Sequence, residues 1–124
     1  MKEQPECKVD EWGDKTWWLN ENLHREDGPA RECANGAKQW WLQGKLHRED
    51  GPAIEFADGT RQWYLNGELH REDGPAYEHA SGSKGWYLNG EPVDPEQIVD
   101  LHLSRGTFCY YNEQTETLHF DEIR

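Results

Sequence analysis

The chain has 124 residues and a formal charge of −12 at pH 7, with 34% hydrophobic and 31% charged residues. This length fits one domain, and the excess of acid disfavours direct binding to nucleic acid or to an anionic membrane, because both require positive charge. The hydrophobic share is small for a core, so seven Trp and five Tyr must supply most of the buried area.

Residues 1–14 are polar and are expected to form an irregular lead-in or a short edge strand that caps the neighbouring residues. They lack the apolar segment of a signal peptide, and no stretch of the chain has the length of a membrane span. Cys7, Cys33 and Cys109 are odd in number and widely spaced, which predicts reduced thiols rather than disulfides or a zinc site. We therefore expect a cytoplasmic protein.

Residues 15–90 consist of a repeat with a period of 23 residues. The segment His-Arg-Glu-Asp-Gly-Pro-Ala begins at His24, at His47 and at His70, unchanged each time. A fixed period of this length predicts an architecture in which each unit buries its apolar side chains against its neighbours. The units are 15–37, 38–60 and 61–83, followed by a partial unit at 84–90.

Each unit is predicted to form a β-hairpin. Residues 62–67 (QWYLNG) join aromatic and branched residues to Asn-Gly, the dipeptide typical of a type I′ turn. A second turn is expected at Asp58-Gly59, after a half-buried strand at 52–57. Pro52 cannot donate to a β-ladder and Gly51 permits unusual dihedrals, so a bend or bulge is predicted there. Stacked hairpins of this kind form an antiparallel meander, so the predicted fold class is mainly β.

Residues 91–124 are predicted to form a non-repetitive cap. Residues 94–97 (DPEQ) have the acid, proline and glutamine of a helix N-terminus, and an apolar pattern follows them up to Gly106. This predicts one short helix. Residues 107–112 and 117–123, separated by a polar turn, predict a final hairpin.

Equivalent residues of successive units recur on every second strand of such a meander, about 9.6 Å apart. Adjacent residues of a strand face opposite sides, so the first aromatic column is predicted to be core, and the C-terminal helix is a candidate to cover it. The second column is then an exposed stripe typical of interaction sites, unless the sheet rolls up and buries it too. The first aromatic column is Trp17, Trp40, Trp63 and Trp86, and the second aromatic column is Trp18, Trp41, Tyr64 and Tyr87.

The spacing Tyr64-x-x-Gly67-x-x-His70 resembles the core of the membrane occupation and recognition nexus (MORN) repeat, which has the same period. The chain departs from that family at Arg71 and Asp73, where the family usually has glycine. It is more similar to the MORN-like WYLNGxLHREDGPA repeat proteins of bacteriophage and large-virus genomes. The resemblance implies a sheet of hairpins that acts as a non-catalytic binding or scaffolding surface. Lipid contact, proposed for some members, is disfavoured here by the acidic charge.

The three His-Arg-Glu-Asp segments raise the question of a metal or catalytic site. Zinc ligands lie about 2.1 Å from the ion, whereas His24, His47 and His70 are expected about 9.6 Å apart. A segment copied three times is more simply explained by structure than by one active site. We expect no enzyme, no cofactor and no metal, and we expect Arg and Glu of neighbouring units to form exposed ion pairs. An enzymatic or metal-binding use of these segments is the less favoured alternative.

The acid is concentrated at residues 84–124, which hold eight Asp and Glu against three Lys and Arg. A basic surface on a host protein that itself binds nucleic acid, as in CRISPR defence, would complement this charge. We therefore expect a phage- or virus-encoded inhibitor of a host protein, without direct contact to nucleic acid or membrane. The alternative is a structural scaffold that self-associates, for example as a homodimer, through open sheet edges. The residues expected to bind the partner are Trp18, Trp41, Tyr64, Tyr87, Glu91, Asp94, Glu96 and Asp100.

Overall fold

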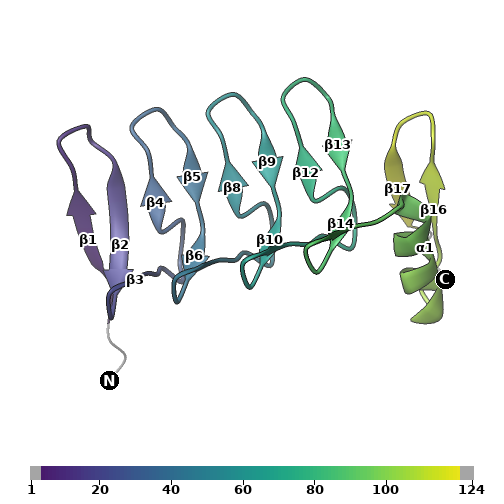
Figure 1. The fold of residues 1–124 in the computed structure, drawn as a ribbon, viewed down its shortest axis with the longest axis horizontal. Coiled ribbons are helices and arrows are strands. Elements are labelled where there is room, and N and C mark those ends of the chain that lie inside the picture. The colour runs from purple at the N-terminus through teal and green to yellow at the C-terminus, as the bar shows by residue number, and fades with distance from the viewer. Residues whose placement is uncertain (1–3, 121–124) are drawn as a thin grey trace.

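The computed structural model describes residues 4–120, which form an elongated stack of β-hairpins with one helix at the C-terminal end (Figure 1). Within this range the largest sheet is antiparallel, with the strand order β1-β2-β4-β5-β8-β9-β12-β13, and β3 adds to β2. The predicted mainly β meander is thus confirmed. The strands of this sheet are β1 (Glu6–Val9), β2 (Lys15–Leu19), β3 (Asn22–Leu23), β4 (Arg31–Glu32), β5 (Lys38–Gln39), β8 (Ile54–Glu55), β9 (Arg61–Gln62), β12 (Tyr77–Glu78) and β13 (Lys84–Gly85).

Three further hairpins lie below the large sheet, one for each repeat of the aromatic-Leu-x-Gly segment (Figure 1). Their turns have the geometry that Asn-Gly predicts, because Asn66 and Gly67 have φ angles of 51° and 83°. The first unit makes the same turn with Asn20 and Glu21, at 50° and 68°. These hairpins consist of β6 (Trp41–Leu42) with β7 (Lys45–Leu46), β10 (Tyr64–Leu65) with β11 (Glu68–Leu69), and β14 (Tyr87–Leu88) with β15 (Glu91–Pro92).

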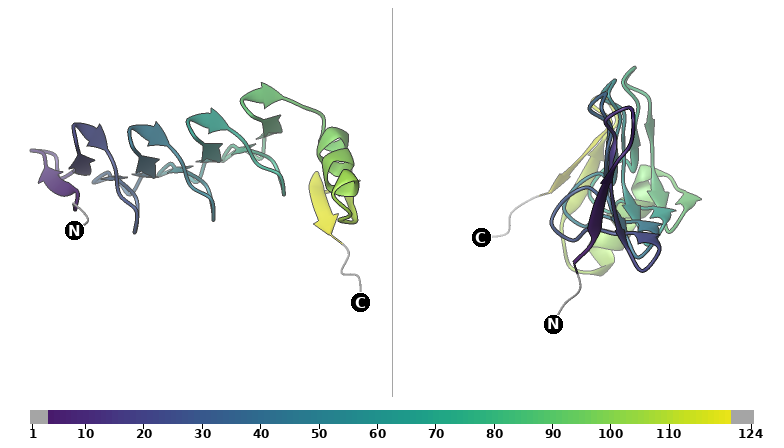
Figure 2. Two further views of the ribbon diagram at one scale, coloured as in Figure 1. Left: turned by 90° about the horizontal axis from the view of Figure 1, so that it is seen from below. Right: turned by 90° about the vertical axis from the view of Figure 1, so that its left-hand side faces the viewer.

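Main-chain hydrogen bonds join each of these hairpins to the next. The N–H of Gly67 donates to the carbonyl of Leu46 at 2.8 Å, and the N–H of Arg48 donates to the carbonyl of Tyr64 at 3.1 Å. The same two bonds link the first unit to the second and the third to the fourth. Successive units are therefore held at β-strand spacing, about 9.6 Å per repeat. Viewed along the stack, the hairpins lie behind one another with a gradual rotation (Figure 2).

The N-terminal lead-in is an edge strand, one of its two predicted forms. β1 pairs with β2 in antiparallel register, with Cys7 opposite Trp17. All four of its side chains are exposed. Within the described residues the large sheet is open, because β1 lies at one end of the strand order and β13 at the other.

The predicted helix and final hairpin are both present. Helix α1 (Pro95–Ser104) begins with proline, and the N–H of Asp94 donates to Gln97 Oε1 at 2.8 Å, as the DPEQ pattern predicts. β16 (Cys109–Asn112) pairs with β17 (Thr117–Phe120), and the rest of the predicted second strand, 121–123, lies outside the described residues. No helix in the described part of the chain is long and apolar enough to cross a membrane.

The helix, one candidate to cover the first aromatic column, does not cover it. Figures 1 and 2 place α1 at the C-terminal end of the stack, beside β16 and β17. Ile98 is fully buried and Val99 is 6% exposed, so the apolar side of α1 packs within the cap. The cap thus closes one end of the stack, and another group must cover the tryptophans.

Candidate functional site

The cover over the first aromatic column is an arginine from each corner loop, a term that denotes residues 24–30, 47–53 and 70–76. In the second unit, the guanidinium carbon of Arg48 lies 3.8 Å from the ring centroid of Trp40. Its Nη1 donates to the carbonyl of Pro52 at 3.0 Å, and its Nε donates to Asp50 Oδ1 at 2.9 Å. The cation–π contact therefore fastens the corner loop to Trp40, and the two hydrogen bonds brace the loop from within. The equivalent stacked pairs are Arg25 on Trp17 and Arg71 on Trp63, each at 3.9 Å.

These arginines form ion pairs with acidic residues of their own unit. The prediction that they pair with acidic residues of neighbouring units was wrong. Arg48 meets Asp50 of its own loop at 2.9 Å and Glu55 of its own unit at 3.9 Å. The Asp50 side chain is 87% exposed, so this pair adds little stability by itself. The stacked ring and the Pro52 carbonyl carry most of the interaction, because the Arg48 side chain is only 23% exposed.

The corner loop requires glycine because the arginine side chain lies very close to the glycine backbone, not because the backbone has a positive φ. Residues 49–51 form a bend, as predicted, and the φ of Gly51 lies outside the left-handed region. A Cβ atom on Gly51 would instead lie 2.9 Å from the guanidinium carbon of Arg48. Glycine thus leaves space for the arginine to lie over the tryptophan. The corresponding distances are 3.1 Å for Gly28 and 2.7 Å for Gly74.

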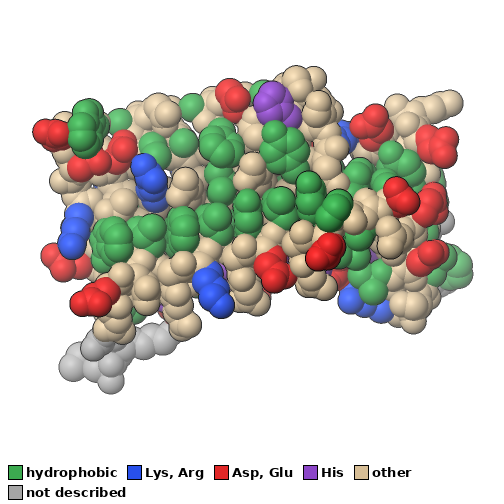
Figure 3. Space-filling view, in the orientation of Figure 1, with side chains coloured by type: hydrophobic (Ala, Val, Ile, Leu, Met, Phe, Trp, Pro, Cys, Tyr) green, Lys and Arg blue, Asp and Glu red, His purple; other side chains and the backbone are tan. Residues whose placement is uncertain are grey.

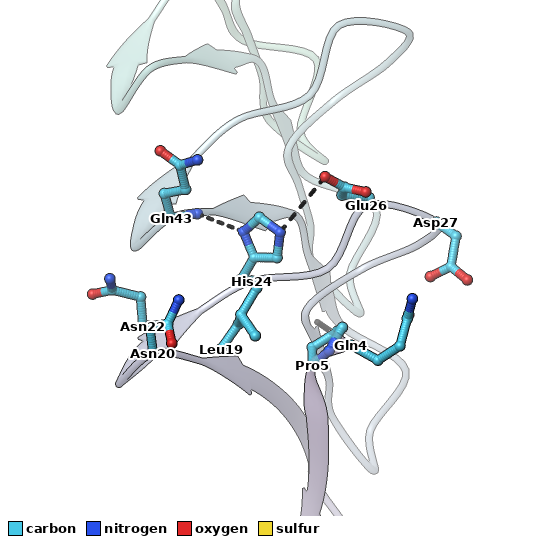
Figure 4. Close-up of a pocket in the computed structure, with 9 residues that line it drawn as sticks. All are labelled: Gln4, Pro5, Leu19, Asn20, Asn22, His24, Glu26, Asp27 and Gln43. Carbon is cyan, nitrogen blue, oxygen red and sulfur yellow. Dashed lines mark hydrogen bonds and ion pairs between the residues drawn. The ribbon is translucent and has the colours of Figure 1, made fainter. Parts of the chain in front are cut away.

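The histidine of each corner loop joins its own unit to the next. His24 Nδ1 accepts a hydrogen bond from the N–H of Gln43 at 2.9 Å, and its Nε2 faces Glu26 at 3.9 Å (Figure 4). Because Nδ1 accepts, the proton of the neutral ring lies on Nε2, and the Nδ1 lone pair is not free for a metal. Among residues 4–120, no group of three or more His, Cys, Asp or Glu could hold a metal ion. The equivalent bonds are Asn66 to His47 and Asn89 to His70, each at 2.9 Å.

Grooves open between neighbouring corner loops on the side of the first aromatic column. The groove between the first two loops has a volume of about 670 Å³ and contains Trp40, Leu42 and Arg48 among its lining residues. A similar space of about 680 Å³ lies at the N-terminal end, beside His24 (Figure 4). Arg48 already pairs with Asp50 of the same loop. The grooves therefore offer mixed charge, with little to select one class of ligand.

The second aromatic column belongs to an apolar row that runs from one end of the stack to the other, on the side opposite the first aromatic column. Each aromatic residue lies directly across its hairpin from an aliphatic residue, as in the pairs Trp41 with Leu46 and Tyr64 with Leu69, and such pairs share a face. Figure 3 shows a band of hydrophobic side chains along the long axis, at the level of β6, β10 and β14. We call the aromatic and aliphatic residues of these cross-strand pairs the apolar row. Its members are Trp18, Leu23, Trp41, Leu46, Tyr64, Leu69, Tyr87 and Pro92.

The apolar row is neither buried nor fully exposed. Seven members are half-buried and Pro92 is exposed. Three aromatic members donate a hydrogen bond from their ring N–H or hydroxyl to the side chain two residues before them, so the polar atoms of these rings have partners within the protein. Burial, and more weakly Tyr87, raises the pKa of Tyr64 above its ordinary value. These bonds run from Trp18 to Thr16 at 2.8 Å, from Trp41 to Gln39 at 2.9 Å and from Tyr64 to Gln62 at 3.2 Å.

The acidic residues predicted to bind the partner gather at the C-terminal end of the stack. Glu91 is exposed in β15, one residue before the end of the apolar row. Asp94 is the N-cap residue of α1. Glu96 and Asp100 are exposed on α1, and their spacing of four places them on one side of the helix. The structure thus brings the four predicted aromatic residues into one row and the four acidic residues to one end of it.

The aliphatic half of the apolar row was not among the predicted binding residues. Leu23, Leu46, Leu69 and Pro92 are adjacent to the aromatic residues only through strand pairing. A signal for them was present, because a two-residue type I′ turn fixes the register of its hairpin. The residue two places after each turn must then lie opposite the second aromatic residue.

The cap completes the fourth unit, which has no corner loop. Tyr111 of β16 meets Trp86 edge-to-face, with ring centroids 5.6 Å apart, and so packs against a tryptophan that has no corner-loop arginine. Trp86 is 9% exposed. Lys84 Nζ donates to the carbonyls of Thr115 and Glu116 at 3.2 and 3.3 Å. The final hairpin is therefore fastened to the last strand of the sheet by side chains.

The helix is fastened to the third corner loop through Glu72. Arg105 donates to the Glu72 carboxylate, His102 contacts the Glu72 carbonyl, and His70 lies 2.9 Å from the same carboxylate. The hydrogen bond from Arg105, with a smaller effect of His70, holds the pKa of Glu72 below its ordinary value. In the second corner loop, by contrast, Glu49 is 85% exposed and lies 3.7 Å from His47.

We expect Glu72→Gln to destabilise the protein at neutral pH but not in acid. A carboxylate with a lowered folded-state pKa contributes stability above its unfolded pKa, and this contribution is lost as the pH falls through the folded-state value. The difference in unfolding free energy between wild type and variant should therefore shrink below about pH 4. Urea titrations followed by tryptophan fluorescence would measure it at several pH values. Glu49→Gln is the matched control, and an equal loss at all pH values would contradict the expectation.

The fold and the contacts define this chain as a repeat protein of stacked β-hairpins, with arginine-fastened corner loops on one side and an open apolar row on the other. A scan of protein-family models, a search of curated proteins and a search of solved structures each find no match.

Proposed function

We propose that this chain is a non-enzymatic module that binds another protein through the apolar row and the acidic end beside it. The continuity of the apolar row over four units is the observation that carries this proposal. Half-buried aromatic residues with satisfied polar atoms present large, ordered contact surfaces at low entropic cost. Aromatic residues of this kind dominate the binding energy of protein interfaces.

The acidic end supports a partner that carries positive charge. Residues 84–124 have eight acidic and three basic residues, and Figure 3 shows acidic side chains over the C-terminal end of the face that carries the band. Charge of one sign beside an apolar surface speeds association with a complementary partner and excludes like-charged ones. The 23-residue repeat and its hairpin stack support a MORN-like module of the phage and large-virus type. Its target would be a basic host protein, such as a nucleic-acid-binding component of a defence system.

The test is capture from bacterial lysate with the tagged wild-type protein and with variants. The bound protein is identified by mass spectrometry, produced in pure form and titrated by calorimetry. Trp41→Ala should lower the affinity by about tenfold or more, and the pair Glu96→Lys with Asp100→Lys should lower it and change its salt dependence. Glu49→Lys, on a corner loop, is the control. A partner that binds all variants equally would remove the apolar row and the acidic end from the function.

Self-association is the second candidate, and the edge strand β1 favours it. β1 pairs with β2 on one side and ends the strand order, so its outer edge is open to another strand. Sedimentation at rising concentration would show a dimer or longer assembly that Cys7→Pro abolishes, because Cys7 faces Trp17, whose N–H points away from β1, so proline there removes a donor of the outer edge. A protein that stays monomeric throughout would exclude this candidate.

A further inference from the structure

The aromatic residues of the apolar row are regularly spaced. They recur once per unit, and main-chain hydrogen bonds such as Gly67 to Leu46, at 2.8 Å, fix the distance between units. Two strand spacings give a step of about 9.6 Å, so the row from Trp18 to Tyr87 spans roughly 29 Å. A ligand that touches every aromatic residue must repeat its own contacts with this step.

The step distinguishes between the regular conformations of a peptide. A polyproline II helix has three residues per turn and places every third residue on one side, about 9.3 Å apart. An α-helix places every seventh residue on one side at about 10.5 Å and so drifts by roughly 3 Å over three steps. A β-strand repeats each side at about 6.6 Å, which does not match. The polyproline II step accumulates a mismatch of only about 1 Å over the same length.

We propose that the apolar row binds an extended proline-rich segment in the polyproline II conformation, with an apolar residue at every third position. This inference rests on the proposed function and names the chemistry of its partner. Each apolar residue of the ligand lies against one of Trp18, Trp41, Tyr64 and Tyr87. Aromatic surfaces are the usual docking sites of such segments, whose preformed shape loses little entropy on binding.

The charge beside the apolar row gives the ligand a further property. Lys8 lies 5.5 Å over the ring of Trp18, at the N-terminal end of the row. At the exposed hairpin tips, Lys45 directly precedes Leu46, whereas Glu68 precedes Leu69 and Glu91 precedes Pro92. Figure 3 shows acidic side chains just below the band toward the C-terminal end. The ligand therefore carries basic residues at the end that lies near Tyr87. A second copy of this chain is disfavoured as the occupant, because both copies would carry a charge of −12.

The probe is a fluorescein-labelled peptide of four Pro-Pro-Leu units followed by two arginines, titrated with the full chain by fluorescence polarisation. The matched peptide has Pro-Pro-Pro-Leu units, which keep the conformation but place the leucines on different sides. We expect the first peptide to bind at least about tenfold more tightly. Replacing its two arginines by glutamates should weaken binding severalfold.

Variants of the protein test whether the peptide binds to the apolar row. Tyr64→Ala and Glu91→Lys should both weaken binding of the first peptide, and Glu49→Lys should not. The melting temperature of each variant shows whether it folds, and the comparison of the two peptides needs no variant at all. Equal binding of both peptides, or none by either, would overturn the proposal. If capture of a folded partner still depends on Trp41 in that case, the proposed function stands and only the polyproline II ligand falls.

Discussion

Replacing Arg48 by alanine is expected to lower the free energy of unfolding by about 2–4 kcal/mol. The substitution removes the cation–π contact with Trp40, at 3.8 Å, and the hydrogen bond to the Pro52 carbonyl, at 3.0 Å. It also exposes the ring of Trp40, which the guanidinium now shields from water. A part-buried carbonyl that loses a charged donor adds part of its desolvation cost to these losses.

Urea unfolding followed by tryptophan fluorescence measures this effect. The matched control is Arg61→Ala, because Arg61 lies 5.8 Å from the Trp63 centroid and pairs with Glu78 at 3.5 Å. Its side chain is 51% exposed, so its removal should cost less than about 1 kcal/mol. Equal losses for the two variants would show that the stacked position of Arg48 has no special role.

The elements that depend on local chemistry could be predicted from the sequence. The Asn66-Gly67 turn and the start of α1 at Pro95 each depend on residues within a few positions of one another. The 23-residue period likewise placed Trp41 and Tyr64 in one column, because stacking of identical units carries each position onto the next.

The remaining features depend on contacts that the 23-residue period does not predict. Arg48 reaches Trp40 across an irregular loop, eight residues back in the chain, so neither strand alternation nor helix spacing predicts the contact. The histidine is similar, since His47 receives the N–H of Asn66 from the following unit. For this reason the sequence pattern predicts ion pairs between units, whereas the structure shows an arginine that pairs inside its own unit.

The placement of the helix was also beyond the sequence. Its capping residues fix where α1 begins, but its position depends on Glu72, which receives Arg105 from beyond the end of the helix. That contact is made across more than thirty residues of chain. The candidate site shows the same division, because the aromatic half of the apolar row follows from the period and its aliphatic half follows from strand register.

Gly51→Ala is expected to cost about 1–3 kcal/mol, and this cost should disappear when Arg48 is already alanine. The new Cβ would lie 2.9 Å from the guanidinium carbon and 3.2 Å from Nε of Arg48, so the arginine must leave Trp40 or the loop must shift. Without the guanidinium the methyl group meets neither atom. A double-mutant cycle therefore isolates the contact, and additive losses would contradict it.

Gly59→Ala is the matched control for this cycle. Gly59 has a φ of +97°, and a Cβ there would meet nothing within 4 Å. Alanine at this position is strained by its own backbone, at a cost of about 1 kcal/mol or more that is independent of Arg48. The same close approach recurs in the other two corner loops, where a Cβ on Gly28 or Gly74 would lie 3.1 or 2.7 Å from the guanidinium carbon of the arginine. Alanine should therefore be unfavourable in all three loops, which have identical sequences.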